Sequence, residues 1–283
     1  MQTAFSHSSL ASFENCPRQY WFRYVERVRV DVESVEAFVG KRVHEILERL
    51  YRFVGRGMVP SLARVLWRFD RTWEEQYDPD RVRVVRAGMD ASAYRTAGTR
   101  CLTNYYRDHY PFDADETVGL ERPIEFALDA DGAYAMRGIV DRVVRARDGA
   151  LEIHDFKTGR RLPSQAELDR DRQLALYELG LRGELGESGA VRLVWHFVLH
   201  GRRRESTRSP EQLDALRRDL MGLVDRVRAE REWAVRPGPL CGWCEYRELC
   251  PAFGAAPRPP AEAPDGAEEP ALEAARELQL QLF

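Results

Sequence analysis

Lys157 and two nearby aspartates are the residues of this sequence whose types and spacing could do chemistry. The chain has 43 lysines and arginines, yet only two of them are lysines, Lys41 and Lys157. Lys157 comes two residues after Asp155 at the end of an alternating apolar run, and Asp141 lies upstream. An ammonium is a compact charge that can touch a phosphate oxygen or a bound water, and a forked guanidinium is a poor substitute. We therefore interpret Lys157 as a residue kept for chemistry rather than as a surface cation.

The two aspartates predict a metal site beside this lysine. Residues two apart on a strand point to the same face, so Asp155 and Lys157 project together, and a hairpin return places Asp141 beside them. Facing carboxylates repel unless a cation lies between them, and hard oxygen ligands favour Mg²⁺ or Mn²⁺. Such a metal lowers the pKa of its bound water and neutralises charge on a scissile phosphate, while Lys157 orients the nucleophile. The chemistry indicated is metal-dependent phosphodiester hydrolysis.

Four of the five cysteines have the spacing of a second metal site. Cys241, Cys244 and Cys250 form a Cys-x2-Cys-x5-Cys pattern, and Cys16 stands far upstream. In a cytoplasmic chain, thiolates this close together indicate tetrahedral zinc or an iron–sulfur cluster rather than disulfides. No histidine lies near the three, and Cys16 and Cys250 each precede a proline, which favours the cluster and leaves zinc as the alternative. Cys101 lies in a helical pattern and is predicted to be a buried, small apolar residue.

The composition is that of a soluble globular protein. Hydrophobic residues make up 44% of the chain and charged residues 31%. No apolar run approaches the roughly 20 residues of a membrane span, and the first residues lack the pattern of a signal peptide, so we expect a cytoplasmic location. The net charge is −3, but the segment after residue 253 carries −4, which leaves the body at +1. That body has three arginine clusters that could hold phosphates, namely Arg81, Arg83 and Arg86; Arg142, Arg145 and Arg147; and Arg202, Arg203 and Arg204.

Periodicity places these residues in a mixed α/β fold. A serine-capped helical region begins the chain, and apolar spacing predicts further helices over about 35–55, 60–77, 84–109, 165–182 and 209–231. Period-two patterns predict strands from Val118 to Leu128, Ala133 to Arg145, Leu151 to Phe156 and Val191 to Leu199. Turns containing Gly132 and Gly149 join the first three strands as hairpins. Helices that flank a small mixed sheet are typical of an α/β or α+β domain.

The order of these motifs resembles one nuclease family. Gly138-Ile139-Val140-Asp141, followed after thirteen residues by Asp155-Phe156-Lys157-Thr158-Gly159, resembles the core motif of the PD-(D/E)XK nuclease superfamily. The similar branch is the RecB-like one, which includes the CRISPR-associated adaptation nucleases. The resemblance covers most of residues 5–253 and implies a restriction-endonuclease-like core. Asp155 stands where glutamate is commoner, and the family pattern allows either acid.

The resemblance also implies roles for residues outside the core motif. His44 corresponds to a helix-borne histidine that adds a metal ligand in this branch, and Glu121 to an acidic residue before the first strand pair. Gln173 and Tyr177 correspond to a Gln-x3-Tyr motif that helps to seat the DNA strand. The four spaced cysteines resemble the [4Fe–4S] ligands of the CRISPR-associated and AddB-type nucleases. Alone, each of these residues has an ordinary structural interpretation, as a helix-face histidine, a surface acid or a half-buried pair.

The sequence predicts one catalytic unit with a tethered tail. Residues 1–253 form this unit, with a helical part at about 1–115, a sheet core at about 116–200 and a C-terminal helix and cysteine segment at about 205–253. Residues 254–276 are rich in Pro, Ala and Glu and are predicted to be a disordered linker. The tail, 277–283, resembles the peptide that bacterial replication proteins insert into the sliding clamp, through Gln279, Leu280, Leu282 and Phe283. The alternative is a terminal helix that folds back on the body.

Together these patterns predict a Mg²⁺- or Mn²⁺-dependent DNA nuclease, and the family resemblance implies exonuclease action on single strands or DNA ends. The clamp-like tail favours repair or replication-associated processing at the nucleoid over CRISPR adaptation. One rival is a catalytically silent DNA-binding adaptor of nuclease fold, and the complete acid and lysine set speaks against it. A second rival is a zinc-stabilised interaction module, which iron analysis would distinguish.

Overall fold

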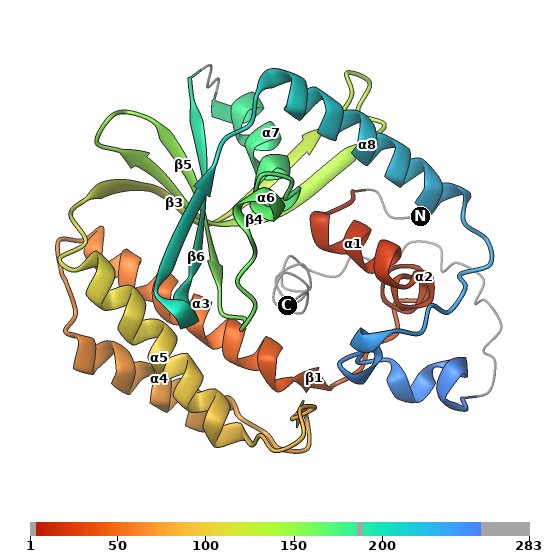
Figure 1. The fold of residues 1–283 in the computed structure, drawn as a ribbon, viewed down its shortest axis with the longest axis horizontal. Coiled ribbons are helices and arrows are strands. Elements are labelled where there is room, and N and C mark those ends of the chain that lie inside the picture. The colour runs from red at the N-terminus through yellow and green to blue at the C-terminus, as the bar shows by residue number, and fades with distance from the viewer. Residues whose placement is uncertain (1–3, 186–188, 256–283) are drawn as a thin grey trace.

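A five-stranded mixed sheet forms the centre of the fold (Figure 1). The computed structural model describes residues 4–185 and 189–255. The strands lie in the order β3-β4-β5-β6-β7; β5 and β6 are parallel and the other neighbours antiparallel. Their bounds are β3 Asp115–Ala127, β4 Ala135–Ala146, β5 Leu151–Lys157, β6 Val191–Phe197 and β7 Arg202–Ser206. The predicted mixed α/β fold is confirmed, and the sheet with its flanking helices fits a restriction-endonuclease-like core.

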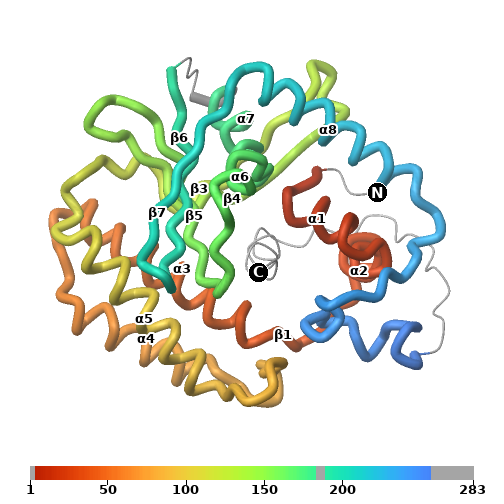
Figure 2. The backbone as a smooth tube through the Cα atoms, viewed as in Figure 1, coloured from red at the N-terminus to blue at the C-terminus, as the bar shows by residue number. Residues whose placement is uncertain are grey.

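Helices cover both faces of this sheet (Figures 1 and 2). Phe156 packs on one face in a cluster with α3, α5 and the outer helix α4. Ile153 packs on the other face in a cluster with α1, α7 and α8. Neighbouring residues of β5 thus supply both cores, because side chains alternate along a strand. The helices are α1 His7–Asn15, α2 Pro17–Tyr20, α3 Val35–Val54, α4 Leu62–Gln76, α5 Ala91–His109, α6 Gln165–Leu168, α7 Gln173–Leu185 and α8 Pro210–Ala229.

Parallel pairing of β5 with β6 requires a crossover, and α6 and α7 supply it. The sequence predicted one helix over 165–182; the structure instead breaks it after Leu168 and restarts it at Gln173. Arg208 causes part of this break, because its guanidinium donates to the carbonyls of Leu168 and Asp171 at 2.7 and 3.0 Å. The Asp171 side chain then accepts the N–H of Gln173 at 3.0 Å. The restart puts Gln173 in the first turn of α7, beside the end of β5.

The N-terminal helices pack against the C-terminal cysteine segment (Figure 2). Phe22, in a π-helical turn over Trp21–Val25, stacks on Tyr246 with ring centroids 5.2 Å apart. Glu245 accepts a hydrogen bond from Gln19 at 3.2 Å and pairs with Arg23. The cysteine segment contains three short 3-10 helices, η3 Pro239–Gly242, η4 Arg247–Leu249 and η5 Pro251–Phe253. Residues more than 200 positions apart therefore form one side of the molecule.

Two further elements differ from the sequence prediction. The helix expected over 84–109 begins only at Ala91, capped by Asp90, whose side chain accepts the Ala93 N–H. Residues 82–83 instead form β2, which pairs in parallel with β1, Glu33–Ser34. Strand β7 was not predicted, because Arg202–Ser206 shows no apolar alternation. It is an edge strand, where charged side chains are common.

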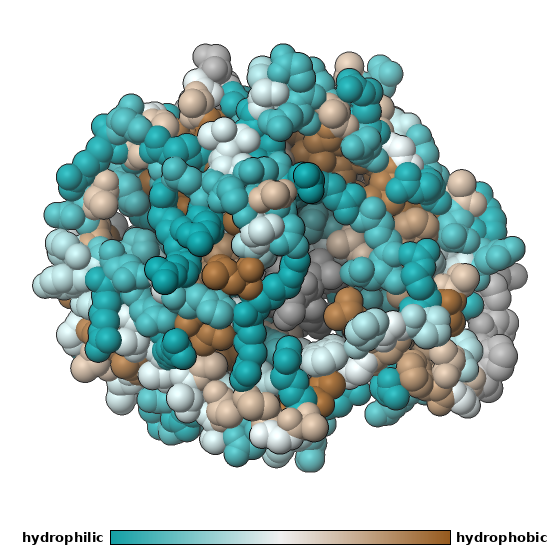
Figure 3. Space-filling model, viewed as in Figure 1, coloured by the Kyte–Doolittle hydropathy of each residue, from teal (hydrophilic) through white to brown (hydrophobic). Residues whose placement is uncertain are grey.

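Hydrophilic side chains cover most of the face shown in Figure 3.

Cys101 is 2% exposed within the α3–α5 cluster, which confirms that it is a buried packing residue. Across residues 4–185 and 189–255, no helix is both long enough and apolar enough for a membrane span.

Candidate active site

The site forms where β4 and β5 stop pairing. The last paired residues of this antiparallel ladder are Arg142 and His154, so Asp141 and Asp155 follow next to each other beyond it. Asp141 Oδ2 accepts the backbone N–H of Phe156 at 2.8 Å, which replaces a ladder hydrogen bond with a side-chain one. Both aspartates are buried, with 5% and 3% exposure. The two carboxylates are therefore held side by side away from bulk water.

Lys157 is locked onto Asp155. Its Nζ lies 2.9 and 2.7 Å from Asp155 Oδ1 and Oδ2, and it donates to Gln173 Oε1 at 2.8 Å. Gln173 in turn donates through Nε2 to Asp155 Oδ1 at 3.1 Å and contacts the Tyr177 hydroxyl at 3.4 Å. The amide thus bridges the ammonium and the carboxylate. All four side chains are buried.

A glycine on β4 lets α7 approach this closely. A Cβ at Gly138 would lie 2.6 Å from the Tyr177 ring, which is closer than any side chain can pack. Gly180 on the same helix similarly meets Phe126 on β3, where a Cβ would lie 2.6 Å from the ring. Both glycines therefore set the distance between α7 and the sheet, and Gly138 explains the first position of the Gly138–Asp141 motif.

His44, Glu121 and Asp141 could hold a metal ion. One ligand atom from each lies within 4.8 Å of the others. Glu121 stands opposite Asp141, between the pairs Leu120–Arg142 and Arg122–Val140, and so lies within β3 rather than before it. Its backbone is left-handed, with φ of 43°, a strained conformation that is common at functional sites. Two carboxylates with one imidazole suit Mn²⁺ or Mg²⁺.

The hydrogen bonds of His44 fix which ring nitrogen faces this group. Nε2 lies 2.7 Å from the carbonyl oxygen of Phe156, and a carbonyl only accepts, so Nε2 carries a proton. Nδ1 lies 3.4 Å from Asp141 Oδ2 and is the atom available to a metal. An outer hydrogen bond of this kind is the usual way in which a ligating histidine is oriented. Both backbone groups of Phe156 therefore support the site, a role that no side-chain motif could predict.

The electrostatics are those of closely coupled charges. Burial opposes the charged ring of His44, but Asp141, with Glu121 and Asp155 behind it, raises the pKa of His44 to about 9. Burial likewise opposes the Asp141 carboxylate, yet His44 and the Phe156 N–H hold its pKa below the usual value. Burial raises the pKa of Asp155 to about 6, against the opposite effect of Lys157. A metal bound by His44 would have to displace its proton, so its affinity should rise with pH up to about 9.

The four spaced cysteines line a separate cavity. They share a cavity of about 230 Å³, lined by Cys16, Cys241, Cys244 and Cys250 with Trp243 and Phe22. All four have free thiols. Burial, with nearby Glu245 and Cys16, raises the pKa of Cys244 to about 12. This thiol therefore keeps its proton until a bound metal replaces that proton. The structure thus brings the remote Cys16 to the C-terminal triplet.

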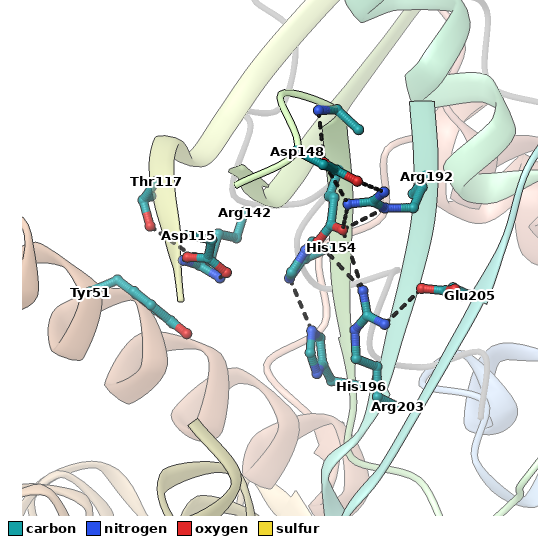
Figure 4. Close-up of polar contacts among 12 residues, drawn as sticks. Tyr51, Asp115, Thr117, Arg142, Asp148, His154, Arg192, His196, Arg203 and Glu205 are labelled. Atoms are coloured by element: carbon teal, nitrogen blue, oxygen red, sulfur yellow. Dashed lines mark hydrogen bonds and ion pairs between the residues drawn. The ribbon is translucent and has the colours of Figure 1, made fainter. Parts of the chain in front are cut away.

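Behind the site, the other face of β5 carries a buried polar chain (Figure 4). His154 Nε2 lies 2.8 Å from Glu152 Oε2, and His196 Nε2 lies 3.0 Å from His154 Nδ1. A carboxylate accepts, so His154 donates to Glu152 and receives a hydrogen bond from His196. Arg192 pairs with Glu152 at 2.6 Å, and Arg203 lies 3.4 Å from it. This chain of side chains holds β5 from the face opposite Asp155 and Lys157, and no pattern in the sequence predicted it.

The arginine clusters behave differently from the prediction. Arg142 is 1% exposed, pairs with Asp115 and donates to Thr117 at 2.9 Å (Figure 4), so its prediction as a phosphate contact was wrong. It sits on the face opposite Asp141, with its guanidinium 3.7 Å from the Tyr51 ring centroid. Arg203 also binds Glu152 and Glu205 internally. The four predicted clamp contacts of the tail lie outside the described residues.

Comparison with known proteins gives a family and a fold. The profile of the PD-(D/E)XK nuclease superfamily matches residues 4–251. The crystal structure of a Eubacterium rectale protein assigned as an exonuclease is similar with a TM-score of 0.52 and 13% identity, over 92% of this chain and 91% of the other, which shows the fold alone. The structure of SSO0001 gives a TM-score of 0.34 at 15% identity, over 87% and 95%, too low to carry an argument. No curated protein matches the chain.

Proposed function

The chain belongs to the PD-(D/E)XK nuclease superfamily, and on that premise we propose that it is a divalent-metal-dependent DNA exonuclease of the RecB-like type. The carrying observation is one constellation: buried Asp141 and His44 and half-buried Glu121 lie within ligand distance of each other, beside the locked Asp155–Lys157 pair. This arrangement supports Mg²⁺ or Mn²⁺ binding through His44, Asp141 and Glu121. Asp155, the other predicted ligand, lies outside that group and pairs with Lys157.

Each residue has a role that its contacts support. A bound metal would neutralise charge on the scissile phosphate and acidify a water molecule. Lys157 is the only cation that touches Asp155 within the described chain, and its Nζ positions the attacking water next to the phosphate. Gln173 keeps that ammonium aimed, and Tyr177, packed over Gly138, supports Gln173 and helps to seat the strand. The substrate is single-stranded DNA or frayed ends, in repair or replication-associated processing.

The chain offers a matched control for testing this function. Protein purified without oxygen should degrade end-labelled single-stranded DNA when Mg²⁺ or Mn²⁺ is added, with duplex DNA assayed in parallel. Lys157→Ala should lower the rate by at least about 100-fold, because a positioned catalytic group contributes on that scale. Lys41→Ala removes the other lysine, which pairs with Glu33 at 3.0 Å, and should keep the wild-type rate. Equal degradation by the Lys157 variant would refute the mechanism.

We also propose that the four cysteines hold a [4Fe–4S] cluster rather than zinc. With Zn–S bonds of about 2.3 Å, tetrahedral zinc holds its sulfurs about 3.8 Å apart. Among the described residues, no three of the four sulfurs lie within 4.8 Å of one another, and the cavity they share is about 230 Å³. This spread supports a group larger than a single ion. Iron analysis and visible absorbance of anaerobic protein test the proposal; stoichiometric zinc without iron would refute it.

Recruitment to the sliding clamp by residues 277–283 is a further part of this proposal. The segment ends in Leu280, Leu282 and Phe283 after an acidic linker, a composition suited to an apolar pocket on a partner. Deletion of 279–283 should abolish co-purification with the clamp and leave nuclease activity unchanged. Unchanged co-purification would remove the clamp from the proposal without touching the nuclease.

A further inference from the structure

A small positive pocket opens directly beside Lys157. It has a volume of about 40 Å³ and lies between the end of β5 and the first halves of α3 and α5. Its polar lining consists of Glu36, Arg86, Tyr94, Lys157, Thr158 and Arg160. Arg86 pairs with Glu36 and Lys157 directs its ammonium to Asp155, so Arg160 supplies the unbalanced positive charge of the pocket. Thr158 adds a hydroxyl donor. None of these residues except Lys157 takes part in the metal constellation described above.

Glu36 organises the donors of this pocket. Its Oε1 accepts the Tyr94 hydroxyl at 2.7 Å and the Arg86 Nε at 3.3 Å. The Arg86 guanidinium also lies 5.6 Å from the ring centroid of Trp243, in the cysteine segment. Glu36 Oε2 is buried without a hydrogen-bond partner. Arg86 and Tyr94 are thus fixed in place before any ligand enters.

Arg160 is the cation of this pocket that has no competing acid. Its Nη2 lies 3.7 Å from Met89 Sδ, and no carboxylate among the described residues pairs with it. Its backbone is held by His200, which donates to the Arg160 carbonyl at 2.9 Å. The side chain is exposed, so an anion reaches it without displacing an ion pair. Its neighbour Arg161 differs, because it pairs with Glu167 and does not line the pocket.

The pocket lies along α3 from the metal constellation. Glu36 and His44 are eight residues apart on this helix, so they lie about 12 Å apart along its axis and about 80° apart around it. Lys157 and Phe156 line the pocket and also contact the constellation, Lys157 through Asp155 and Phe156 through His44. A strand whose scissile phosphate lies at the metal constellation would bring a neighbouring phosphate to this pocket.

We propose that this pocket is a subsite for a second phosphate of the same DNA strand, one or two nucleotides from the scissile one, with Arg160 as its principal contact. The proposal rests on the nuclease function proposed above and names a specificity-determining contact for it. Thr158 and Arg86 complete the donor set, and Glu36 orients Arg86. Such a contact makes cleavage depend on a continuing strand rather than on a single phosphodiester.

The test measures binding rather than cleavage. An Asp141→Asn background prevents degradation, and the asparagine oxygen can still accept the Phe156 N–H. In this background, Arg160→Ala should weaken binding of labelled single-stranded DNA about fivefold at 0.1 M salt, and should lower the slope of log Kd against log salt by about 0.7. Arg161→Ala is the matched control and should leave both quantities unchanged.

A scan of the strand locates the contact. Single methylphosphonate linkages, which remove one phosphate charge each, are placed along the DNA around the cleavage position. At one position the neutral linkage should weaken DNA binding by the Asp141→Asn protein about fivefold. At the same position it should not weaken DNA binding by the Arg160→Ala variant any further, because both changes remove the same contact. Equal effects of the two arginine variants, or additive losses at every position, would overturn the subsite. If the protein binds DNA but fails this test, only the subsite is refuted and the nuclease function stands. If the wild-type protein neither binds nor cleaves DNA, both the subsite and the nuclease function are refuted.

Discussion

At the scale of single residues, the contacts of Lys157 explain why the chain keeps an ammonium there. Its Nζ makes three contacts of 2.7 to 2.9 Å with Asp155 and Gln173. A guanidinium would spread the same charge over a plane wider than this buried site, which is 6% exposed at Lys157. Gln173 is a neutral partner, so it can orient the ammonium without lowering its charge. That makes Gln173 a positioning residue.

Replacement of Gln173 tests this role. Gln173→Leu keeps the volume but removes the acceptor for Lys157 and the donor to Asp155, and we expect kcat to fall about 10- to 100-fold, the usual cost of losing an orienting partner. The KM for DNA should change little. Gln173→Glu restores an acceptor for Nζ and should recover part of kcat. Gln165→Leu, on α6 and exposed, is the control; a Gln173→Leu enzyme as active as this control would contradict the role.

The site residues could be predicted from the sequence where spacing on one element carried the information. Asp155 and Lys157 share a strand, and Gln173 and Tyr177 share a helix face, so period alone groups each pair. The support from the Phe156 backbone could not be predicted, because it depends on where β4 stops pairing. The burial of Arg142 was missed for a related reason. An arginine on an alternating strand can be exposed or buried. Arg142 is buried because Asp115 and Tyr51 contact its guanidinium, and these partners are not evident from the strand pattern.

At the scale of elements, β5 works as a two-sided strand. Asp155 and Lys157 face α7, while Glu152, His154 and the β6 residue His196 form the polar chain toward α3 and α5 (Figure 4). Burial, together with nearby arginines, holds the pKa of His154 well below its usual value. Burial and His154 do the same for the pKa of His196. The folded strand pair therefore requires both rings to be neutral.

This requirement predicts a pH dependence of stability. Below a pH of about 6.5 the unfolded chain protonates these histidines and the folded chain does not, so the free energy of unfolding should fall as the pH drops. His196→Gln can keep the hydrogen bond to His154 but cannot titrate. Between pH 6.5 and 5 its slope should be smaller than that of the wild type by up to about 1.4 kcal/mol per pH unit. Urea unfolding at several pH values measures this.

The control for that experiment is His200→Gln, whose ring is exposed and bonds to the Arg160 carbonyl. Its slope should match that of the wild type. His7 contributes to the slope in every variant, because burial lowers its pKa to about 4, so the slope decreases in His196→Gln without vanishing. An unchanged slope in His196→Gln would show that the chain accommodates a charged His196.

Helices and strands could be predicted from the sequence where their buried residues recur at the regular spacing of a helix or a strand. The four strands with apolar alternation were found, and β7 was not, because three of its five residues are exposed arginines and only Ser206 is buried. One of them, Arg203, pairs with Glu152 and Glu205 instead of packing. The break between α6 and α7 was hidden for another reason. It depends on Arg208, some 36 residues beyond the break, which caps carbonyls that a continuous helix would have used internally.

At the scale of the whole molecule, the two ends of the described chain clasp each other. Tyr246 stacks on Phe22 and donates to the Val28 carbonyl at 3.2 Å, and Arg83 donates to the Cys244 carbonyl at 3.0 Å. These contacts bring the cysteine segment next to α2 and to the strand β2, from which Arg86 reaches the pocket beside Lys157. The sequence predicted a link between Cys16 and the triplet, but not these apolar and polar contacts around it.

Loss of the proposed cluster should therefore loosen one side of the molecule and not the proposed active site. A link from residue 16 to residue 241 removes at most about 5 kcal/mol of unfolded-state entropy. Cys244→Ser should abolish bound iron and lower the melting temperature, while the contacts of Phe22 with Tyr246 and of Glu245 with Arg23 keep the segment partly docked. Weaker DNA binding should accompany this loss, because Arg86 stands between Trp243 and the pocket.

Cys101→Ser, in the α3–α5 cluster, should destabilise the chain without changing its iron content, which separates cluster loss from simple core damage. If Cys244→Ser kept its iron, its melting temperature and its DNA affinity, the cysteine cavity would have no part in holding the two ends together.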